Sequence, residues 1–481
     1  MNVLERWMET LDGIVWGIPL LLLLLGTGAF LMIRMRFLPV RRLGYALGCA
    51  VGRIPEKDTV YHERHGAEKG MAHSERRGAE KGMTHSERCG AEKGISPRSS
   101  LMTELAATIG IGNIVGVATA MVLGGPGALF WMMAAAFLGL PLKFAESELS
   151  VKYRARTREG RPVGGPMYTL ERAFPNRAAG RFLAKLYAVF AVFASFGMGN
   201  MTQANAIAKS VRKSFGVTEA ETGLVLTIVV IIVVLGGIGM ISGLASYLVP
   251  GMALFYLIGI LTVILTHASH IPDGIADILT QAFSARSAAG GIGGMMTAMR
   301  YGVSRGVFSN EAGLGAGGIT AAAARTNDPV RQGYISMTGV FFDTMVLCLL
   351  TGMALAVSGV LGIRNDCGQP LTGVELMIAV FGSTFGEAGA FIVSIGMTLF
   401  AFATIIAWEY QGECAFVFLT GKRSHRMIYR MAYGLVTFIG AVCSLELVWD
   451  FSDIMNGLMA VPNLICVLVL SGTVCRDIRE Y

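Results

Sequence analysis

The sequence predicts an all-α integral membrane protein with about 11 transmembrane helices. One N-terminal helix precedes a ten-helix core, which consists of two inverted five-helix halves with broken first and sixth helices. Three observations predict this fold. Of the 481 residues, 53% are hydrophobic and only 15% are charged, whereas soluble domains carry about 25% charged residues. Apolar runs of about 20 residues, the length that crosses a bilayer, recur along the chain. Glycine-rich polar interruptions fall in the second and seventh of these runs.

The candidate membrane spans are eleven apolar segments. They cover roughly residues 14–33, 101–123, 127–150, 184–210, 222–241, 244–267, 288–322, 333–359, 386–420, 427–446 and 450–475. Several of these segments are longer than a bilayer is thick, so their helices must tilt, break or extend beyond it.

The basic residues orient these helices, because cytoplasmic loops are enriched in Lys and Arg. The loop that follows the third span is basic from Lys152 to Arg161, and another basic loop runs from Lys422 to Arg426. The first span begins after acidic residues and ends at a basic cluster, which predicts an outside N-terminus and a cytoplasmic C-terminus. The net charge of +7 does not indicate a nucleic-acid partner, because the positive residues lie in these loops.

The segments group into five predicted regions. These are an N-terminal transmembrane helix with its basic cytoplasmic end (1–51), a flexible cytoplasmic linker (52–98), a first five-helix half (99–270), a second five-helix half (271–476) and a cytoplasmic tail (477–481). The linker contains three 12-residue repeats with too few hydrophobic residues to form a core. A tandem expansion explains the repeats, and weak metal binding by their histidines is the alternative.

The segment from Thr103 to Gly127 contains Gly110, Gly112 and Gly116, with Asn113 midway along the predicted span. Clustered glycines in a membrane helix are tolerated only against protein or a water-lined cavity. A helix break at this point would free carbonyl groups for a cation and amide groups for a carboxylate. The alternative is a close helix–helix contact through small residues, and spacing alone does not separate the two.

A second glycine-rich run, from Gly302 to Gly318, contains Ser309, Asn310 and Glu311. These polar residues cannot all face lipid at low cost. The run lies in the helix of the second half that corresponds to the first interrupted helix. Inverted-repeat transporters place substrate and ion sites between two such broken helices. A packing contact does not require this correspondence, so the pair favours a transport site.

Other polar residues lie inside predicted spans. Asn200 and Gln203 share a helix face and either line a pathway or hydrogen-bond between helices. Asp343 is either a coupling site or a paired structural carboxylate. Thr404 and Trp408 are one turn apart. The hydroxyl suits a hard cation, and the indole forms either a pocket wall or part of the core.

Four further charged residues, Arg300, Arg305, Glu409 and Glu413, are interpreted as members of ion pairs near the span boundaries. The sequence contains no nucleophile–base pair, phosphate loop or metal-ligand cluster, so we expect no enzyme.

Six strings occur in the order GIGNIVGVATAMVLGGPGALFWM, KFAESELSVKYR, GGPMY, FGMGNMTQANAIA, RGVFSNEAGLG and FFDT. Together they resemble the alanine or glycine:cation symporter family, also called the sodium:alanine symporter family, of the amino acid–polyamine–organocation superfamily. The resemblance runs from about residue 14 to 475 and leaves out the repeats. It implies sodium-coupled uptake of alanine- or glycine-type small neutral amino acids by alternating access, in a bacterial-type cell membrane. A proton-coupled or other small-solute symporter, or a non-transporting membrane sensor, is the alternative. No oligomeric state is implied.

The resemblance also implies the binding residues. The amino acid would be surrounded by Thr108, Gly110, Ile111, Gly112, Asn113, Gln203, Phe308, Ser309, Asn310 and Trp408. Sodium, as coupling ion and not as a prosthetic group, would be held by the carbonyl groups of Ile109 and Gly112 and the hydroxyl of Thr404.

Two features depart from the family pattern. Ile111 stands where the family usually has threonine, and Ala316-Gly317-Gly318 follows the second interruption in place of the usual residues. The larger apolar side chain of Ile111 argues against a substrate with a large side chain.

Overall fold

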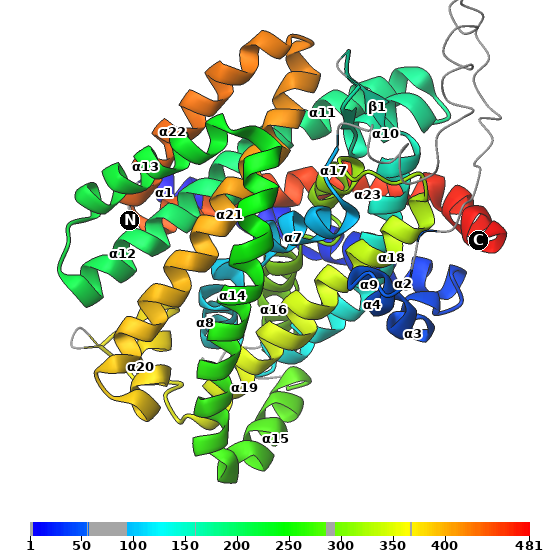
Figure 1. Ribbon diagram of the computed structural model, residues 1–481. Coiled ribbons are helices and arrows are strands. Elements are labelled where there is room, and N and C mark those ends of the chain that lie inside the picture. Colours follow the sequence, from blue (N-terminus) through cyan, green and yellow to red (C-terminus); the bar gives the residue numbers. More distant parts are fainter. Residues whose placement is uncertain (1–2, 55, 57–93, 159, 285–293, 366–367) are drawn as a thin grey trace, which may run out of the picture.

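The structure is a computed structural model that describes residues 3–54, 56, 94–158, 160–284, 294–365 and 368–481. These residues are almost entirely helical (Figure 1). Between the helices lies an antiparallel hairpin, whose strands β1 (Ala155–Arg156) and β2 (Pro162–Val163) have two residues each. The all-α prediction is therefore confirmed.

The N-terminal region consists of α1 (Val3–Val15), α2 (Ile18–Arg34), α3 (Leu38–Arg41) and α4 (Leu43–Ala50). The first half of the core contains α7 (Pro97–Thr108), the 3-10 turn η1 (Ile111–Asn113), α8 (Val115–Leu123), α9 (Ala128–Lys152), α10 (Pro166–Ala173), α11 (Arg177–Phe196), the π-helical turn η2 (Gly197–Met201), α12 (Thr202–Phe215), α13 (Glu219–Leu235) and α14 (Gly237–Thr266).

A short turn, η3 (Ala268–His270), and α15 (Ile271–Ala282) lead to the second half. That half contains α16 (Gly294–Asn310), α17 (Ala316–Ala322), α18 (Pro329–Val340), the π-helical segment η4 (Phe341–Cys348), α19 (Leu349–Val357), α20 (Gly373–Phe385), α21 (Ala388–Thr420), η5 (Arg423–His425), α22 (Arg426–Val442) and α23 (Leu445–Glu480).

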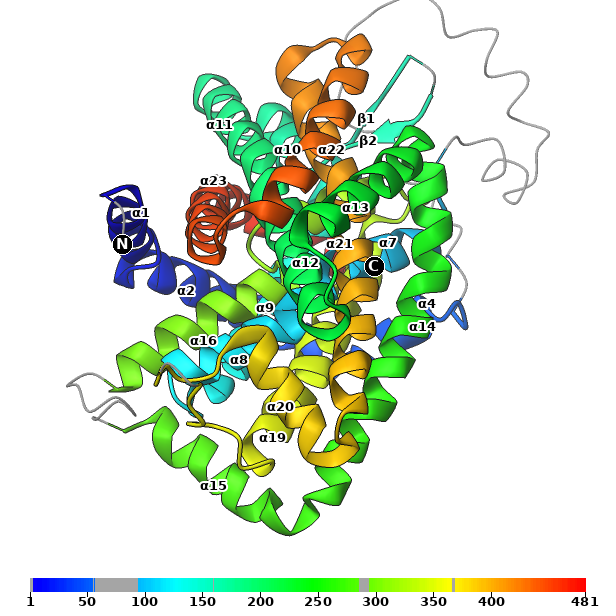
Figure 2. The same ribbon diagram turned by 90° about the vertical axis from the view of Figure 1, so that its left-hand side faces the viewer.

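The two halves present their elements in the same order. Each has a broken helix, a long helix, a short helix, a second long helix and two further helices. The two short helices lie at opposite ends of the molecule, with α10 at the top and α20 at the bottom of both side views (Figures 1 and 2). A repeat whose second copy is turned over produces this placement.

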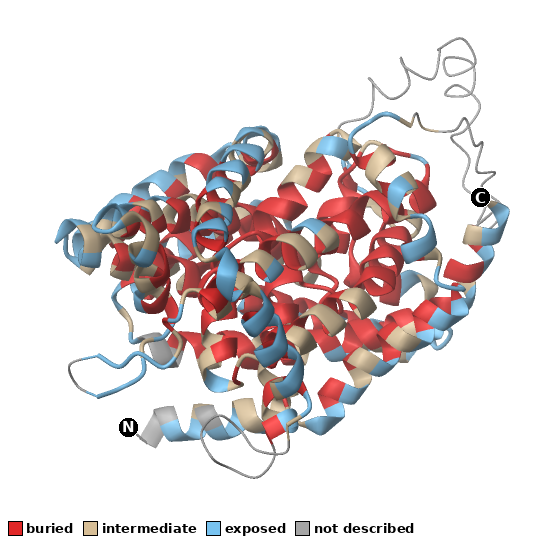
Figure 3. Ribbon diagram, turned by 90° about the horizontal axis from the view of Figure 1, so that it is seen from below, coloured by how far each residue is buried: buried red, intermediate tan, exposed pale blue. Residues whose placement is uncertain are grey.

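Seven helices of the described chain are long and apolar enough to cross a membrane. They are Arg6–Arg34, Ala128–Lys152, Arg177–Phe215, Gly237–Thr266, Pro329–Val357, Ala388–Thr420 and Val448–Glu480. The other four predicted spans correspond to the two broken pairs, α7/α8 and α16/α17, and to α13 and α22, which have 17 residues each. The buried residues gather in the middle of the molecule and the exposed ones along its outer helices (Figure 3).

Close approach of α16 to α9 depends on Gly302. A β-carbon at this position would lie 2.3 Å from the carbonyl oxygen of Ala128, so only glycine lets the two backbones come this close. Gly302 thus belongs to a packing contact inside a continuous helix. The second interruption is shorter than the glycine-rich run suggested, because α16 continues to Asn310 before the chain breaks.

The charged residues near the span boundaries form the expected ion pairs. Arg300 pairs with Asp12 at 2.9 Å, and Arg305 pairs with Asp453 at 2.7 Å. The Glu409 and Glu413 carboxylates both face Arg430, and Arg426 adds a second pair to Glu413. The first pair ties α1 to α16.

Most of the predicted linker, residues 57–93, lies outside the described residues. Its two ends meet the same segment of the second half. Glu56 accepts hydrogen bonds from the Thr326 hydroxyl and the Asn327 amide, at 2.8 and 3.0 Å. Ile95 pairs with the backbone after α17, because its amide donates to Ala323 at 3.1 Å and its carbonyl accepts from Arg325 at 2.7 Å.

We therefore predict that residues 57–93 are dispensable for stability. A Gly/Ser linker of about ten residues has ends about 16–19 Å apart on average. With this replacement, the purified protein should unfold within about 2 °C of the full chain, because the repeats have too few hydrophobic residues to form a core. Thermal unfolding in detergent measures this. Extending the replacement to residue 96 removes the Ile95 pairing and should lower the unfolding temperature. A large drop for the shorter replacement would contradict the prediction.

Candidate functional site

The two helix breaks touch each other in the protein interior. A β-carbon on Gly112, in the first break, would lie 3.1 Å from the α-carbon of Ser309, in the last turn of α16. The second break contains Glu311, Gly313 and Gly315, which have φ angles of 57°, 94° and 77°. Positive φ angles suit glycine. Both halves of the core thus place irregular backbone at one point, where it is buried in protein.

The first break is held by side chains from within it and from α12. The Gly110 amide donates to Asn113 Oδ1 at 3.0 Å, and the Ile111 amide donates to Gln203 Oε1 at 3.2 Å. Gln203 is oriented in turn by its own bond to the Met198 carbonyl, at 3.1 Å. These contacts satisfy two amide groups that the interrupted helix leaves without intrahelical partners.

Thr404 reaches the first break from α21. Its hydroxyl donates to the Ala106 carbonyl at 3.0 Å or to the Phe400 carbonyl at 3.2 Å. A β-carbon on Gly110 would lie 2.5 Å from the Thr404 hydroxyl oxygen, so glycine is required there. Among the described residues, no hydrogen bond ends on the Ile109 carbonyl oxygen. The C-terminal end of α7 therefore offers a free carbonyl beside a hydroxyl.

Asp343 links the two breaks on η4. Its Oδ1 accepts from Asn113 Nδ2 at 2.8 Å. Its Oδ2 accepts from the hydroxyls of Ser309 at 2.8 Å and Thr344 at 2.6 Å. Asn310 bonds to the same Thr344 hydroxyl at 3.1 Å. Three donors from three different segments surround this carboxylate, which supports the interpretation of Asp343 as a paired structural acid.

The second break is held mainly by α9 and α23. Glu146 Oε1 accepts from the Gly313 amide at 2.8 Å and from Asn463 Nδ2 at 2.7 Å. Asn463 also donates to the Gly313 carbonyl at 2.8 Å. The Tyr187 hydroxyl donates to the Leu314 carbonyl at 3.1 Å. Together these side chains take the place of the missing helical hydrogen bonds.

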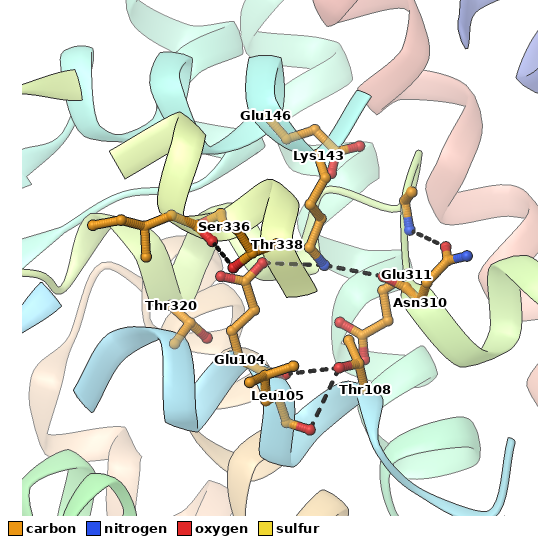
Figure 4. Close-up of polar contacts among 12 residues, drawn as sticks. Glu104, Leu105, Thr108, Lys143, Glu146, Asn310, Glu311, Thr320, Ser336 and Thr338 are labelled. Atoms are coloured by element: carbon orange, nitrogen blue, oxygen red, sulfur yellow. Dashed lines mark hydrogen bonds and ion pairs between the residues drawn. The ribbon is translucent and has the colours of Figure 1, made fainter. Parts of the chain in front are cut away.

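A fully buried lysine connects both breaks (Figure 4). Lys143 Nζ lies 3.3 Å from Glu104 Oε1 on α7 and donates to the Asn310 carbonyl at 3.2 Å. A β-carbon on Gly317 would lie 2.6 Å from both charged groups of this pair. The glycine at 317, one of the two departures from the family pattern, thus leaves room for the buried ion pair.

Several predicted site residues come together at the first break. They are all buried, and each contacts another member or is adjacent to one in the sequence. The set consists of Gly110, Ile111, Gly112, Asn113, Gln203, Ser309 and Thr404. Trp408 joins them through the second break, because its Nε1 donates to Glu311 Oε1 at 2.6 Å.

Other predicted residues make different contacts. The Thr108 hydroxyl bonds to carbonyls of its own helix, at 3.3 and 3.4 Å. Phe308 stacks on Trp449 with ring centres 4.9 Å apart, and its ring also lies against the first break, because a β-carbon on Gly112 would be 3.3 Å from Phe308 Cδ1. Asn200 donates to the Tyr433 carbonyl at 2.8 Å, as the interhelical alternative expects.

The sequence reasoning missed the buried charges Glu104, Lys143 and Glu146 as members of the site. A signal was present, because all three lie inside predicted membrane spans. Ionisable residues at such depth need a partner. Which partners they find depends on how the helices pack, so the sequence pattern did not pair them.

The comparisons with known proteins agree with this architecture. The model of the sodium:alanine symporter family matches residues 75–481. The sodium/alanine symporter AgcS of Methanococcus maripaludis is 42% identical over 474 residues, which are 98% of this chain and 96% of that protein. The probable sodium/glutamine symporter GlnT of Bacillus subtilis is 32% identical over 481 residues, which are 100% of this chain and 91% of that protein.

Among solved structures, the crystal structure of MhsT in complex with L-phenylalanine aligns with a TM-score of 0.56 at 13% identity, covering 79% of this chain and 90% of that one. This likeness concerns the fold alone. From the family match and its relatives, the chain belongs to the sodium:alanine symporter family, whose members are membrane transporters and not enzymes, with an amino acid as substrate and sodium as coupling ion.

Proposed function

We propose that this protein carries a small neutral amino acid of the alanine or glycine type into the cell together with sodium, by alternating access. The observation that carries the proposal is the meeting of two helix breaks at a buried point, with the free Ile109 carbonyl and the Thr404 hydroxyl beside it. Unwound backbone at the centre of an inverted repeat is where such transporters bind substrate and ion.

The amino acid would lie against the first break. The N-terminal end of α8 carries partial positive charge and favours the substrate carboxylate. The Ile111 amide, held by Gln203 in this structure, is a donor that the carboxylate could accept from. The proposed lining is Thr108, Gly110, Ile111, Gly112, Asn113, Gln203, Phe308, Ser309, Asn310 and Trp408.

The size of the substrate would be limited by this packing. Ile111 is completely buried, and no side chain fits at Gly110 against Thr404. A substrate with a side chain of one methyl group or none meets least resistance. The names of the relatives specify different amino acids, alanine for AgcS and glutamine for GlnT, and the small space favours alanine.

Sodium would lie at the C-terminal end of α7. The carbonyl oxygens of Ile109 and Gly112 and the Thr404 hydroxyl are the proposed ligands, and the end of the helix dipole favours a cation there. A bound ion would bridge α7 and α21 and stabilise the first break, which improves the amino acid site. Linkage requires that the amino acid tightens sodium binding by the same factor.

The deciding experiment is uptake of radiolabelled alanine into proteoliposomes. Accumulation is expected with an inward sodium gradient and not with choline, and a negative inside potential should increase it, since each translocated charge gains about 2.3 kcal/mol per 100 mV. Competition by glycine, serine, D-alanine and glutamine ranks the substrates. Uptake driven by a proton gradient alone would favour proton coupling. No accumulation of labelled alanine under any of these conditions would favour a non-transporting sensor.

For the amino acid site, we predict that Gln203→Ala raises the half-saturating alanine concentration about tenfold or more, because the proposed site loses a lining side chain that holds the first break in place through the Ile111 amide. Uptake at saturating sodium measures this. Asn205→Ala is the matched control, since Asn205 donates to the Gly440 and Cys443 carbonyls away from the break. This variant should lower the stability of the protein and leave the half-saturating alanine concentration within about threefold of the wild-type value. A half-saturating alanine concentration in Gln203→Ala equal to that of the wild type would contradict the proposed amino acid site.

For the sodium site, we predict that Thr404→Val raises the half-saturating sodium concentration about tenfold, since the variant keeps the side chain's shape and removes an oxygen ligand. The half-saturating alanine concentration at saturating sodium should change much less. Thr398→Val on the same helix is the control, because its hydroxyl bonds to the Ser394 carbonyl one turn back. Equal effects of the two variants would remove Thr404 from the ion site.

A further inference from the structure

We propose that the Glu311 carboxylate is a further ligand of the transported sodium ion, which it faces from the second helix break. This inference rests on the proposed function, because it places the ion between the two breaks. It adds a negatively charged ligand to a site that otherwise consists of neutral oxygens.

The backbone holds Glu311 in an unusual conformation. Its φ angle of 57° lies in the left-handed region, which costs free energy for a residue other than glycine. The residues on either side of it are fixed, because the Ala312 amide donates to Asn310 Oδ1 at 2.9 Å and the Gly313 amide to Glu146 at 2.8 Å. The break therefore sets the direction of the Glu311 side chain, which is completely buried.

One carboxylate oxygen of Glu311 is used and the other is free. Oε1 accepts from Trp408 Nε1 at 2.6 Å. Oε2 is buried and has no hydrogen-bond partner among the residues that the structure describes. Buried polar atoms normally find a partner, so a lone carboxylate oxygen inside the protein indicates a missing donor or cation.

The free oxygen belongs to a group that lies beside the proposed ion site. Trp408, which holds the other oxygen, is one helical turn after Thr404 on α21. Figure 4 shows the Glu311 carboxylate turned toward Thr108, the last residue of α7. Thr404 contacts the same end of α7 through the Ala106 carbonyl. The Glu311 carboxylate, the Thr404 hydroxyl and the end of α7 therefore face one region.

Electrostatics at this position favours a cation. The C-terminal end of a helix carries partial negative charge, and it repels the Glu311 carboxylate. Lys143 relieves part of this repulsion through space, while its direct ion pair within the described chain is with Glu104, at 3.3 Å. Both oxygens of Asp343 accept hydrogen bonds, whereas Glu146, like Glu311, has donors on one oxygen and none among the described residues on the other. Glu311 differs from Glu146 in that its carboxylate is turned toward the end of α7 (Figure 4), where a sodium ion would balance its charge.

The test uses Glu311→Gln in the full-length protein. Glutamine keeps an oxygen that accepts from Trp408, so the substitution removes the charge and replaces the free oxygen by an NH2 group. Thermal unfolding is followed while sodium chloride replaces choline chloride, with no amino acid present. The sodium concentration at half-maximal stabilisation should rise about tenfold or more. In proteoliposomes, the half-saturating sodium concentration should rise equally, and the half-saturating alanine concentration at saturating sodium should change by less than about threefold.

Two further variants keep the test decisive. Glu413→Gln neutralises another buried carboxylate, which lies on α21 and pairs with Arg426 and Arg430 of α22. Its sodium titration should stay within about twofold of the wild type. Glu311→Asp keeps the charge on a shorter side chain, and its sodium requirement should lie between those of the wild type and Glu311→Gln. If Glu311→Gln does not fold, a sodium titration of Glu311→Asp that matches that of the wild type would overturn the proposal.

Three other results would also overturn it. One is an unchanged sodium titration in Glu311→Gln, and another is an equal shift of the sodium titration in Glu413→Gln. The third is a loss of alanine binding with normal sodium binding, which would assign Glu311 to the substrate ammonium group. Sodium-dependent unfolding requires no transport. A wild type that binds sodium without accumulating alanine would therefore refute the proposed function and leave the Glu311 test intact.

Discussion

The rest of this structure depends on one constraint, that backbone N–H and C=O groups freed inside a membrane must find partners in the protein. The chain interrupts two helices at the same depth and then supplies partners from other helices. Gln203 and Asn113 bind amides of the first break, whereas Glu146 and Asn463 hold the second. The few backbone groups left over, such as the Ile109 carbonyl, are then available to a ligand.

Buried charge follows from the same constraint. Lys143 is completely buried between α9, Glu104 of α7 and the end of α16, where it neutralises one carboxylate and binds one carbonyl. Such a pair contributes little net stability, but losing one member would leave the other as an uncompensated charge in a low-dielectric interior. It therefore restricts how α7 and α16 can move relative to α9. A transporter needs restrictions of this kind, because its helices must exchange between a few defined arrangements.

The two roles first considered for the glycine-rich segments are both present, at different residues. Gly302 serves close helix packing within a continuous α16. Gly110 lies in a break and also meets Thr404 closely, and Gly112 lies in the same break against Ser309. Spacing did not separate packing from interruption because the missing β-carbon serves both.

The sequence by itself determined the all-α membrane fold, the number and approximate bounds of the spans, the two interrupted helices and the family. These follow from hydrophobic length, loop charge and local motifs, which are properties of short segments. Only the tertiary structure decided that the second break lies after Asn310, that Asp343 accepts from both broken helices, and that Lys143 pairs with Glu104. Partners separated by tens to hundreds of residues are selected by helix packing, because a buried polar group bonds to whichever neighbour the fold brings within reach.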